Sequence, residues 1–242
     1  MKLIKLDAID STNDFLKALS ASQDLENFTV VTAENQTKGK GQMGAVWNSE
    51  KSKNLIMSVF VKDLLLNVEA IYLLNIATSL AIIQVLKDQK INHLKIKWPN
   101  DIMSDNFKLA GILIENSFKS DGSITSIIGV GLNVNQTNFE NLPKASSMAV
   151  VSNSYFDKDQ LVELIVNQLK ENIKLIGSHS QILWAKYMDL LFKKGIPMPF
   201  TIGDNKPIMG IITSVTKQGK LTVLHEDDCL VDYGLKEIQL LY

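Results

Sequence analysis

The sequence has few of the residues that disulfide bonds and zinc sites require. It contains one cysteine, Cys229, so no disulfide can form within the chain, and this suits a reducing compartment. We expect Cys229 to be a small buried or strand residue rather than a catalytic thiol. The three histidines lie far apart, without cysteine partners at metal-binding spacing, so the sequence predicts no zinc site.

Excess charge of one sign and uninterrupted apolar runs are also missing. The formal net charge is -1, which argues against duplex nucleic acid and anionic membranes as partners. The N-terminal apolar run is too short for a signal peptide. The apolar segment 69–86 is interrupted by Asn75, Thr78, Ser79 and Gln84, which favours a buried helix over a membrane span. We therefore expect a soluble, cytoplasmic protein.

The sequence does contain an alternation of strand-like and helix-like segments over most of its 242 residues. Apolar periodicity predicts strands over 28–34, 54–61, 93–98, 108–115 and 124–134, and helices over 69–90, 157–176 and 179–192. Asp157, with Gln160 three residues later, has the spacing of a helix N-cap. Residues 117–123 are typical of a hairpin turn, and 135–154 of a long loop.

The pattern changes after Gly195. Five short strand-like runs, separated by turns, are typical of a small all-β barrel. We therefore expect two domains, a mixed helix-and-strand domain over 1–194 and a β-barrel over 195–242.

Two stretches combine glycine or helix-capping residues with polar side chains. Residues 36–47, QTKGKGQMGAVW, lie between two strand-like runs, and such glycines indicate either a long turn or a backbone that a ligand approaches closely. Residues 10–14, DSTND, predict a helix start capped by Ser11 or Thr12. That start either only caps the helix or also presents free N–H groups to a polar ligand. Spacing alone leaves these alternatives open.

Two further stretches carry polar residues beside predicted strands. KWPND (97–101) puts a lysine, a ring, an amide and a carboxylate where a strand stops, so it is either a solvated turn or a site on a rigid scaffold. Asp101 could bind magnesium that is shared with nucleotide phosphates. Lys108 opens KLAGILIE (108–115) as either a solvated edge charge or a functional cation. In GVGLNVN (129–135), Asn133 is either a turn former or a reader of a purine edge.

Together the four stretches resemble the catalytic domain of biotin protein ligases, enzymes that attach biotin to a carboxylase carrier domain. The resemblance runs from about residue 8 to residue 134. It rests on STN, a Gly-x-Gly-x-x-Gly-x-x-Trp loop, KWPND, KLAGILIE and GVGLNVN in this order. The C-terminal strands also resemble the small barrel of that family. The resemblance favours a ligand-binding role for the glycine loop.

This resemblance implies an α+β fold like that of class II aminoacyl-tRNA synthetases, a mixed and largely antiparallel sheet with helices, plus a C-terminal SH3-like β-barrel. It implies a ligase that joins biotin to magnesium-bound ATP as biotinyl-5′-AMP and transfers the biotin to a lysine of a biotin carboxyl carrier protein. Homodimers are common in this fold. The chain starts close to the catalytic domain, so we expect no helix-turn-helix and no DNA partner.

The resemblance also implies roles for individual residues. The catalytic cations would be Lys40, Lys97 and Lys108. Biotin would be bound by Ser11, Thr12, Asn13, Gln36, Lys40, Gly41, Gln42, Trp47, Lys108 and Gly111. The nucleotide would be bound by Gly39, Gly44, Asn100, Gly131 and Asn133, and Asp101 would organise the metal.

Two alternatives remain open at this stage. One is a lipoate or octanoate ligase of the same superfamily, against which the KWPND and KLAGILIE pairing and Trp47 argue. The other is a non-catalytic module that binds biotin or a nucleotide. Such a module would be expected to lose the lysines, but Lys40, Lys97 and Lys108 are all present.

The glycine loop departs from the family at Gln42, and this generates a prediction. The family's loop is rich in arginine, whereas Gln42 can form hydrogen bonds but carries no charge. A charged contact is worth about 1.5–3 kcal/mol against about 1 kcal/mol for a neutral one, so Gln42→Arg should slow the release of biotinyl-AMP about tenfold. The measurement is the decay of the purified enzyme–adenylate complex without carrier protein. An unchanged or faster decay would contradict the role given to position 42.

Overall fold

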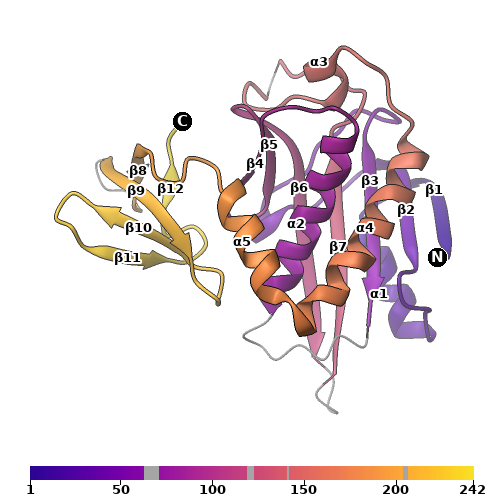
Figure 1. The fold of residues 1–242 in the computed structure, drawn as a ribbon. Helices are drawn as coiled ribbons and strands as arrows, with labels where there is room; N and C mark the ends of the chain where they lie inside the picture. The colour runs from indigo at the N-terminus through magenta and orange to yellow at the C-terminus, as the bar shows by residue number, and fades with distance from the viewer. Residues whose placement is uncertain (63–70, 119–122, 141, 204–206) are drawn as a thin grey trace.

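The computed structural model describes residues 1–62, 71–118, 123–140, 142–203 and 207–242. These residues form a seven-stranded sheet, a second sheet of five strands and five α-helices within the described ranges (Figure 1). The strands of the larger sheet are β1 Leu3–Ile9, β2 Val30–Gln36, β3 Leu55–Val61, β4 Leu94–Lys97, β5 Asp101–Ser104, β6 Phe107–Phe118 and β7 Ile124–Leu132. The helices are α1 Thr12–Ser22, α2 Ile71–Asp88, α3 Met148–Ser152, α4 Lys158–Ser178 and α5 Ser180–Leu190.

The larger sheet is mixed and mostly antiparallel, which confirms the predicted fold class. Its strand order is β1-β2-β3-β7-β6-β5-β4. β1 and β2 are parallel, and the remaining neighbours are antiparallel. Every residue of β3, LIMSVFV, is buried because this strand lies in the sheet interior with both faces covered. A continuous apolar run rather than an alternating one is what such a position requires.

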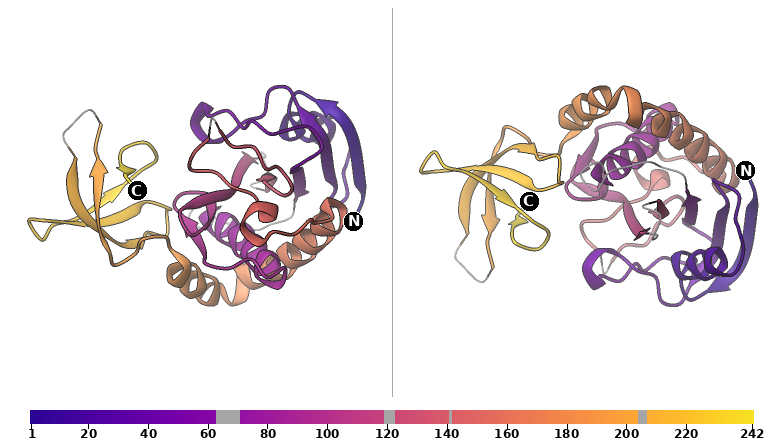
Figure 2. Two further views of the ribbon diagram at one scale, coloured as in Figure 1. Left: turned by 90° about the horizontal axis from the view of Figure 1, so that it is seen from above. Right: turned by 90° about the horizontal axis from the view of Figure 1, so that it is seen from below.

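Helices cover both faces of this sheet (Figure 1 and Figure 2). Residues that alternate along each strand point to opposite faces. Val30 and Val59 therefore belong to the main core under α2 and α4, while Val31 and Phe60 pack with Leu16 of α1 in a second, smaller core. The two helix layers thus fix both faces of the strands that carry the polar motifs.

Helix α2 is a core helix. It is long and apolar enough to cross a membrane by length and composition, with a mean hydropathy of 1.3, but 72% of it is buried inside the protein. It packs against α4, and Asn172 of α4 donates a hydrogen bond to the carbonyl of Ala77. This confirms the predicted buried helix for Ile71–Asp88, while residues 69 and 70 of the prediction lie outside the described residues.

The C-terminal strands form a separate antiparallel sheet, as the sequence predicted for the end of the chain. They are β8 Pro197–Thr201, β9 Ile208–Val215, β10 Leu221–His225, β11 Leu230–Tyr233 and β12 Gln239–Leu240, in the order β11-β10-β9-β8-β12. Their apolar side chains, including Phe200 and Val223, belong to the same core as the large sheet. The boundary at residues 194 and 195 stays a prediction.

The two sheets meet at a tight turn. The carbonyl of Gly219, in the turn between β9 and β10, accepts a hydrogen bond from Trp98 Nε1 at 2.8 Å. Gly219 has φ +84°, and a Cβ there would lie 2.4 Å from the Tyr72 ring. Trp98 belongs to KWPND, so the C-terminal sheet is attached directly to one of the four motifs.

Several local predictions were confirmed. Ser11 caps α1 by accepting from the N–H of Asp14 at 3.3 Å. Asp157 caps α4 by accepting from the N–H groups of Asp159 and Gln160. The helix predicted over 179–192 is present as α5.

Other local predictions were wrong or incomplete. β1 was not predicted, and neither was β5, because a four-residue strand directly after Pro99 has too little periodicity to recognise. The loop 135–154 contains the short helix α3, capped by Ser147. Of the turn predicted over 117–123, residues 119–122 lie outside the described residues. Cys229 is exposed and precedes β11, so the expectation of a buried or strand residue was wrong; a hydrogen bond to Asp227 raises its thiol pKa.

The turn at Gly219 gives a stability prediction with a matched control. Gly195 also has a positive φ, +75°, but open space around its Cβ position. Gly195→Ala should cost about 1–2 kcal/mol for the left-handed backbone alone. Gly219→Ala should cost a further 1–3 kcal/mol or so because its methyl group overlaps Tyr72. Urea unfolding of both variants measures the difference, and equal losses would show that the Tyr72 contact is not tight.

Candidate active site

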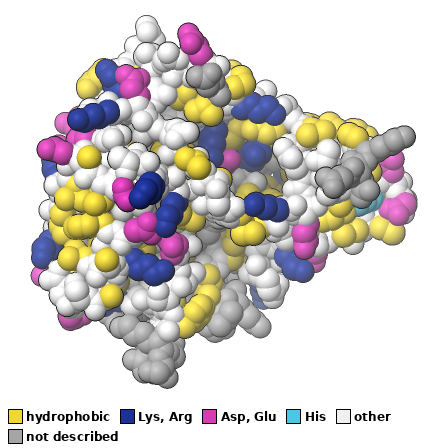
Figure 3. Space-filling model, turned by 180° about the vertical axis from the view of Figure 1, so that it is seen from behind, with side chains coloured by type: hydrophobic (Ala, Val, Ile, Leu, Met, Phe, Trp, Pro, Cys, Tyr) yellow, Lys and Arg dark blue, Asp and Glu magenta, His cyan; other side chains and the backbone are white. Residues whose placement is uncertain are grey.

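The polar motifs converge on one cavity of about 460 Å³. It is lined by the start of α1, the glycine loop, β5, β6, β7 and the C-terminal strands. Figure 3 shows dark blue lysine side chains around the hollow between the larger body and the C-terminal part. The predicted site residues that line it are Ser11, Thr12, Asn13, Gln36, Lys40, Gly41, Gln42, Trp47, Lys97, Asn100, Asp101, Lys108, Gly111 and Gly131.

One end of the cavity is a buried, neutral polar network. Gln36 Oε1 accepts from the Thr12 N–H at 2.7 Å and from the Thr12 hydroxyl at 3.0 Å. Ser58 Oγ lies 2.8 Å from Thr12 Oγ1 and 2.6 Å from Asn13 Oδ1. Ser11, Thr12, Asn13 and Ser58 are all buried, so a ligand here meets fixed amides and hydroxyls rather than mobile water.

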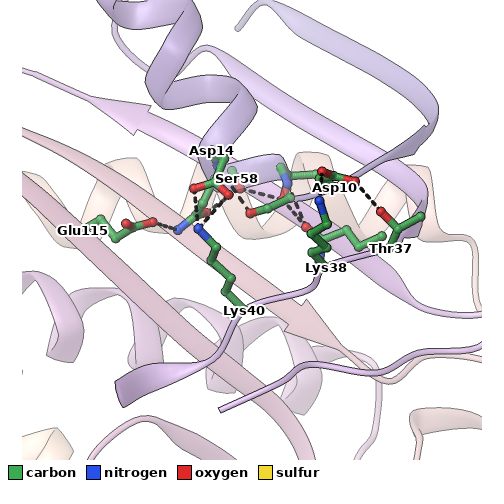
Figure 4. A network of polar contacts seen from close by, with 11 residues as sticks. Asp10, Asp14, Thr37, Lys38, Lys40, Ser58 and Glu115 are labelled. Carbon is green, nitrogen blue, oxygen red and sulfur yellow. Dashed lines mark hydrogen bonds and ion pairs between the residues drawn. The ribbon is translucent and has the colours of Figure 1, made fainter. Parts of the chain in front are cut away.

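Charged residues surround this network on its outer side (Figure 4). Asn13 Nδ2 donates to Glu115 Oε2 at 2.8 Å. Lys40 reaches from the glycine loop to Asp14 at 2.7 Å, and Lys38 reaches to Asp10 at the same distance. The hydrogen bond that Lys40 donates to Asp14 raises the pKa of Lys40. The loop is therefore held to the start of α1 by two exposed ion pairs.

The glycine loop is a tight hairpin, which confirms the turn interpretation, while its role in ligand binding stays a prediction. The Gly41 N–H donates to the Ala45 carbonyl at 2.7 Å, and the Trp47 N–H donates to the Gly39 carbonyl at 2.9 Å. Its tip, the short 3-10 turn Gln42–Gly44, has φ +53° at Met43 and +82° at Gly44. Gly39 is required for another reason, since a Cβ there would lie 2.3 Å from the Trp47 carbonyl.

One rung across the sheet brings three of the motifs together. Lys97 is opposite Asp101, Asp101 is opposite Gly111, and Gly111 is opposite Gly131. Residues that are opposite in neighbouring strands share a face. The motifs KWPND, KLAGILIE and GVGLNVN therefore meet on this rung through backbone register alone.

The two glycines of this rung form a slot for Trp47. A Cβ on Gly131 would lie 2.4 Å from the indole ring, and one on Gly111 would lie 3.2 Å from it. Lys108 Nζ lies 5.5 Å from the ring centroid, within cation–π range. Trp47 Nε1 is buried without a hydrogen-bond partner among the described residues. An unpaired buried donor is costly, so this N–H is available to a ligand in the cavity.

The other end of the cavity is cationic. Asp101 Oδ1 lies 2.6 Å from Lys108 Nζ, and Asp101 Oδ2 lies 3.8 Å from Lys97 Nζ. Burial lowers the pKa of Lys97, and the charges of Lys108 and Lys144 lower it further. Asn100 fixes the turn, because its Nδ2 donates to the Ile112 carbonyl at 2.6 Å. A single carboxylate thus faces several lysines, which suits an anionic ligand.

Comparison with known proteins identifies the family. The family model for "Biotin/lipoate A/B protein ligase family" matches residues 6–135, more than half of the chain. This chain belongs to the biotin/lipoate A/B protein ligase family. The rung lies within the matched segment, and so do most residues that line the cavity, while the C-terminal strands that complete its lining lie outside it.

Relatives and solved structures agree with this family. The "Bifunctional ligase/repressor BirA" of Escherichia coli is 28% identical over 97% of this chain and 73% of its own length. The "Biotin--[acetyl-CoA-carboxylase] ligase" of Mycobacterium tuberculosis is 28% identical over 87% of this chain and 79% of its own length. The structure "Biotin protein ligase from Aquifex aeolicus in complex with biotin and ATP" matches with TM-score 0.81 and 23% identity, over 99% of this chain and 98% of that one. At that identity the likeness concerns the fold.

Three residues that were predicted to bind the nucleotide do not line the cavity. Gly39 and Gly44 lie on the outer side of the glycine loop, and the backbone conformation of the loop requires glycine at both positions. Asn133 is buried, and its Nδ2 donates to the carbonyl of Ser146 at 3.0 Å, so it fastens the loop after β7. Their direct contact with a nucleotide stays a prediction.

The donor set around Asp101 does not fit a resident magnesium ion. Asp101 is the one carboxylate among the described residues that line the cavity, and both of its oxygens face lysines. Magnesium prefers six oxygen ligands in octahedral geometry. A magnesium ion would therefore have to enter with a nucleotide that supplies phosphate oxygens.

Sequence reasoning missed three residues of the site. Ser58 was detectable as the single polar residue within the apolar run LIMSVFV. Glu115 closes KLAGILIE, but nothing local shows that it reaches Asn13. Lys236, which donates to the Met43 carbonyl at 2.7 Å, comes from the C-terminal part of the chain and carries no motif.

The Trp47 slot gives a graded prediction. Gly131→Ala should push the indole ring aside and lower the free energy of unfolding by about 1–3 kcal/mol. Gly111→Ala should cost less than about 1 kcal/mol, because the ring needs to move only slightly and Lys108 is flexible. Denaturant unfolding of the two variants tests this order. A reversed order would mean that Trp47 does not rest on Gly131.

Proposed function

We propose that this chain is an ATP-dependent biotin–protein ligase that modifies a lysine of a biotin carboxyl carrier domain. The supporting observation is a cavity with two chemically different ends, a neutral network at Thr12, Asn13 and Ser58 and a cationic end at Lys97 and Lys108. The relatives that are 28% identical over most of the chain are named ligases, and one is named a biotin ligase.

The neutral end suits the ring of biotin. A ureido ring has one carbonyl acceptor and two N–H donors, so it needs fixed polar partners, which the buried network supplies. The dithiolane ring of lipoate and the chain of octanoate offer no such groups and would leave the network unmatched. This favours biotin over the acids of the alternative ligases.

The cationic end suits the chemistry of activation. The carboxylate oxygen of biotin attacks the α-phosphorus of ATP, and the bond to the bridging oxygen breaks to release pyrophosphate. The two anionic reactants repel each other, so lysines near the reacting atoms offset the charge. Lys108 is the best placed, since it lies beside Gly111 and over Trp47.

The second step consumes biotinyl-5′-AMP, the mixed anhydride that the first step forms. The ε-amine of the carrier lysine attacks the acyl carbon, an amide forms, and AMP leaves with the electrons of the broken bond. Trp47 and the hairpin of the glycine loop shield the adenylate from water until the carrier arrives. The two ion pairs from Lys38 and Lys40 hold this hairpin in place.

The metal, the oligomeric state, the partners and the location are proposed on the basis of the same function. Magnesium would enter as the counter-ion of ATP, with Asp101 near its phosphates. The open edge of β1 offers unpaired backbone groups for a homodimer. The net charge of -1 favours neither DNA nor a membrane as a partner, and the cytoplasm supplies both ATP and carrier protein.

The experiment that tests the function is exchange of labelled pyrophosphate into ATP with the purified protein. Biotin should support exchange, while lipoate and octanoate should not. Exchange with lipoate alone would identify the alternative ligase. Exchange with none of the acids, together with biotin binding, would indicate the non-catalytic module.

Replacing Lys108 gives the sharpest kinetic prediction. Its side chain is about one-third exposed and pairs with Asp101 at 2.6 Å. In the proposed mechanism it offsets the charge that develops at the α-phosphate. Lys108→Ala should slow biotin-dependent exchange on the order of a hundredfold, equivalent to about 3 kcal/mol. Lys174→Ala, which removes an exposed pair with Glu171 on α4, is the control and should exchange normally. Near-normal exchange by folded Lys108→Ala would remove this residue from the reaction.

A further inference from the structure

A lysine outside all four motifs lies next to the cationic end of the cavity. The Lys108 N–H donates to the Lys144 carbonyl at 2.8 Å, and the Ser146 N–H donates to the Lys108 carbonyl at 3.0 Å. Residues 144–146 therefore run beside the start of β6 like a short extra strand. This pairing brings the backbone of Lys144 directly alongside that of Lys108.

The ring of Tyr242 ties Lys144 to KWPND. Lys144 Nζ lies 4.2 Å from the ring centroid, and Lys97 Nζ lies 5.2 Å from it. The ring is itself held edge-on against Phe192 at 5.2 Å. The Leu241 N–H donates to the Pro199 carbonyl at 2.9 Å, so the backbone before Tyr242 is also fixed. One aromatic ring thus contacts two ammonium groups from distant parts of the chain.

These groups leave positive charge unbalanced. Asp101 is in contact with Lys108 and Lys97, whereas Lys144 forms no ion pair with any of the described residues. The positive charge of Lys144 helps to lower the pKa of Lys97. Asp101 thus faces two of these three lysines and Lys144 lies beside them, so the cluster suits an anion with more than one negative group.

Composition strengthens this argument. All 25 basic residues of the chain are lysines, and arginine is absent. A lysine is a point charge and lacks the two-pronged hydrogen bonding by which arginine grips a phosphate. A polyphosphate bound by this chain therefore needs several lysines where a guanidinium would otherwise serve.

We propose that Lys144, positioned by the ring of Tyr242, binds the β- and γ-phosphates of ATP and stabilises the departing pyrophosphate. The proposal rests on the proposed ligase function. Lys108 lines the cavity beside Gly111. Lys144 is on the exposed segment next to it, just outside the cavity lining, where the tail of the triphosphate would emerge. When the bond at the α-phosphorus breaks, the electron pair moves onto the pyrophosphate oxygen, and a nearby cation stabilises that charge.

The test separates the two half-reactions. Lys144→Gln should raise the KM for ATP and for pyrophosphate in the exchange reaction about tenfold, as expected for a lost charge-assisted contact. Transfer from purified biotinyl-AMP to the carrier involves no pyrophosphate, so its rate should stay unchanged. Lys170→Gln is the matched control, because Lys170 also lies over a ring, that of Phe28 at 5.3 Å, but belongs to α4 rather than to the segment that pairs with Lys108.

The positioning role of the ring has its own variants. Tyr242→Leu should raise the KM for pyrophosphate severalfold with little change in kcat, and Tyr242→Phe should restore most of the loss because it keeps the aromatic face. An equal effect of leucine and phenylalanine would overturn the role of the ring.

Other outcomes would overturn the role of Lys144. Unchanged KM values in Lys144→Gln would do so, and so would a defect confined to transfer, which would indicate carrier docking instead. If the wild type catalyses no exchange with any acid, the ligase function is refuted. Calorimetric titration with inorganic pyrophosphate then still tests whether Lys144 takes part in a pyrophosphate-binding site. Weaker binding by Lys144→Gln than by Lys170→Gln would support the proposal, and equal binding would refute it.

Discussion

The register of β5, β6 and β7 is the constraint on which the site depends. Asp101, Gly111 and Gly131 occupy one rung, and Lys97 extends that rung onto β4. A slip of one residue in any of these pairings would turn the affected side chains to the opposite face. The carboxylate would then leave the lysines, and a side chain would enter the slot of Trp47. The positions of these site residues are therefore set by backbone hydrogen bonds rather than by side-chain contacts.

The glycine loop shows how structural and functional demands coincide. Gly44 is needed for its positive φ and Gly39 for the approach of the Trp47 carbonyl, while Gly111 and Gly131 receive the ring of the same tryptophan. None of these glycines needs a ligand to explain it. Yet the hairpin that contains Gly39 and Gly44 lines the cavity, where the indole N–H is buried without a partner among the described residues. A loop shaped for its own packing can thus also present a binding surface.

The C-terminal sheet takes part in the site as well as in the core. Trp98 of KWPND bonds to Gly219, Lys236 bonds to the tip of the glycine loop, and Tyr242 lies against Lys97. Two of these contacts reach KWPND, and the third reaches the glycine loop. Since the apolar residues of both sheets form one continuous core, the C-terminal strands are positioned firmly enough to set the cavity's dimensions. In a chain without arginine, this assembly of scattered lysines is how positive charge is concentrated.

The sequence by itself determined the features that depend on interactions between residues close together in the chain. The caps at Ser11 and Asp157 were readable because a side chain two or three residues away satisfies the free N–H groups. The buried character of β3 and α2 was readable from apolar runs, and the chemical groups of the site were readable from four motifs in order. Long-range pairing decided the rest. Only the folded structure brings Ser58 to Thr12, Glu115 to Asn13 and Lys144 to Lys97, and assigns Asn133 to a loop rather than to the cavity. Such contacts depend on register and on packing between segments tens of residues apart, which local preference does not encode.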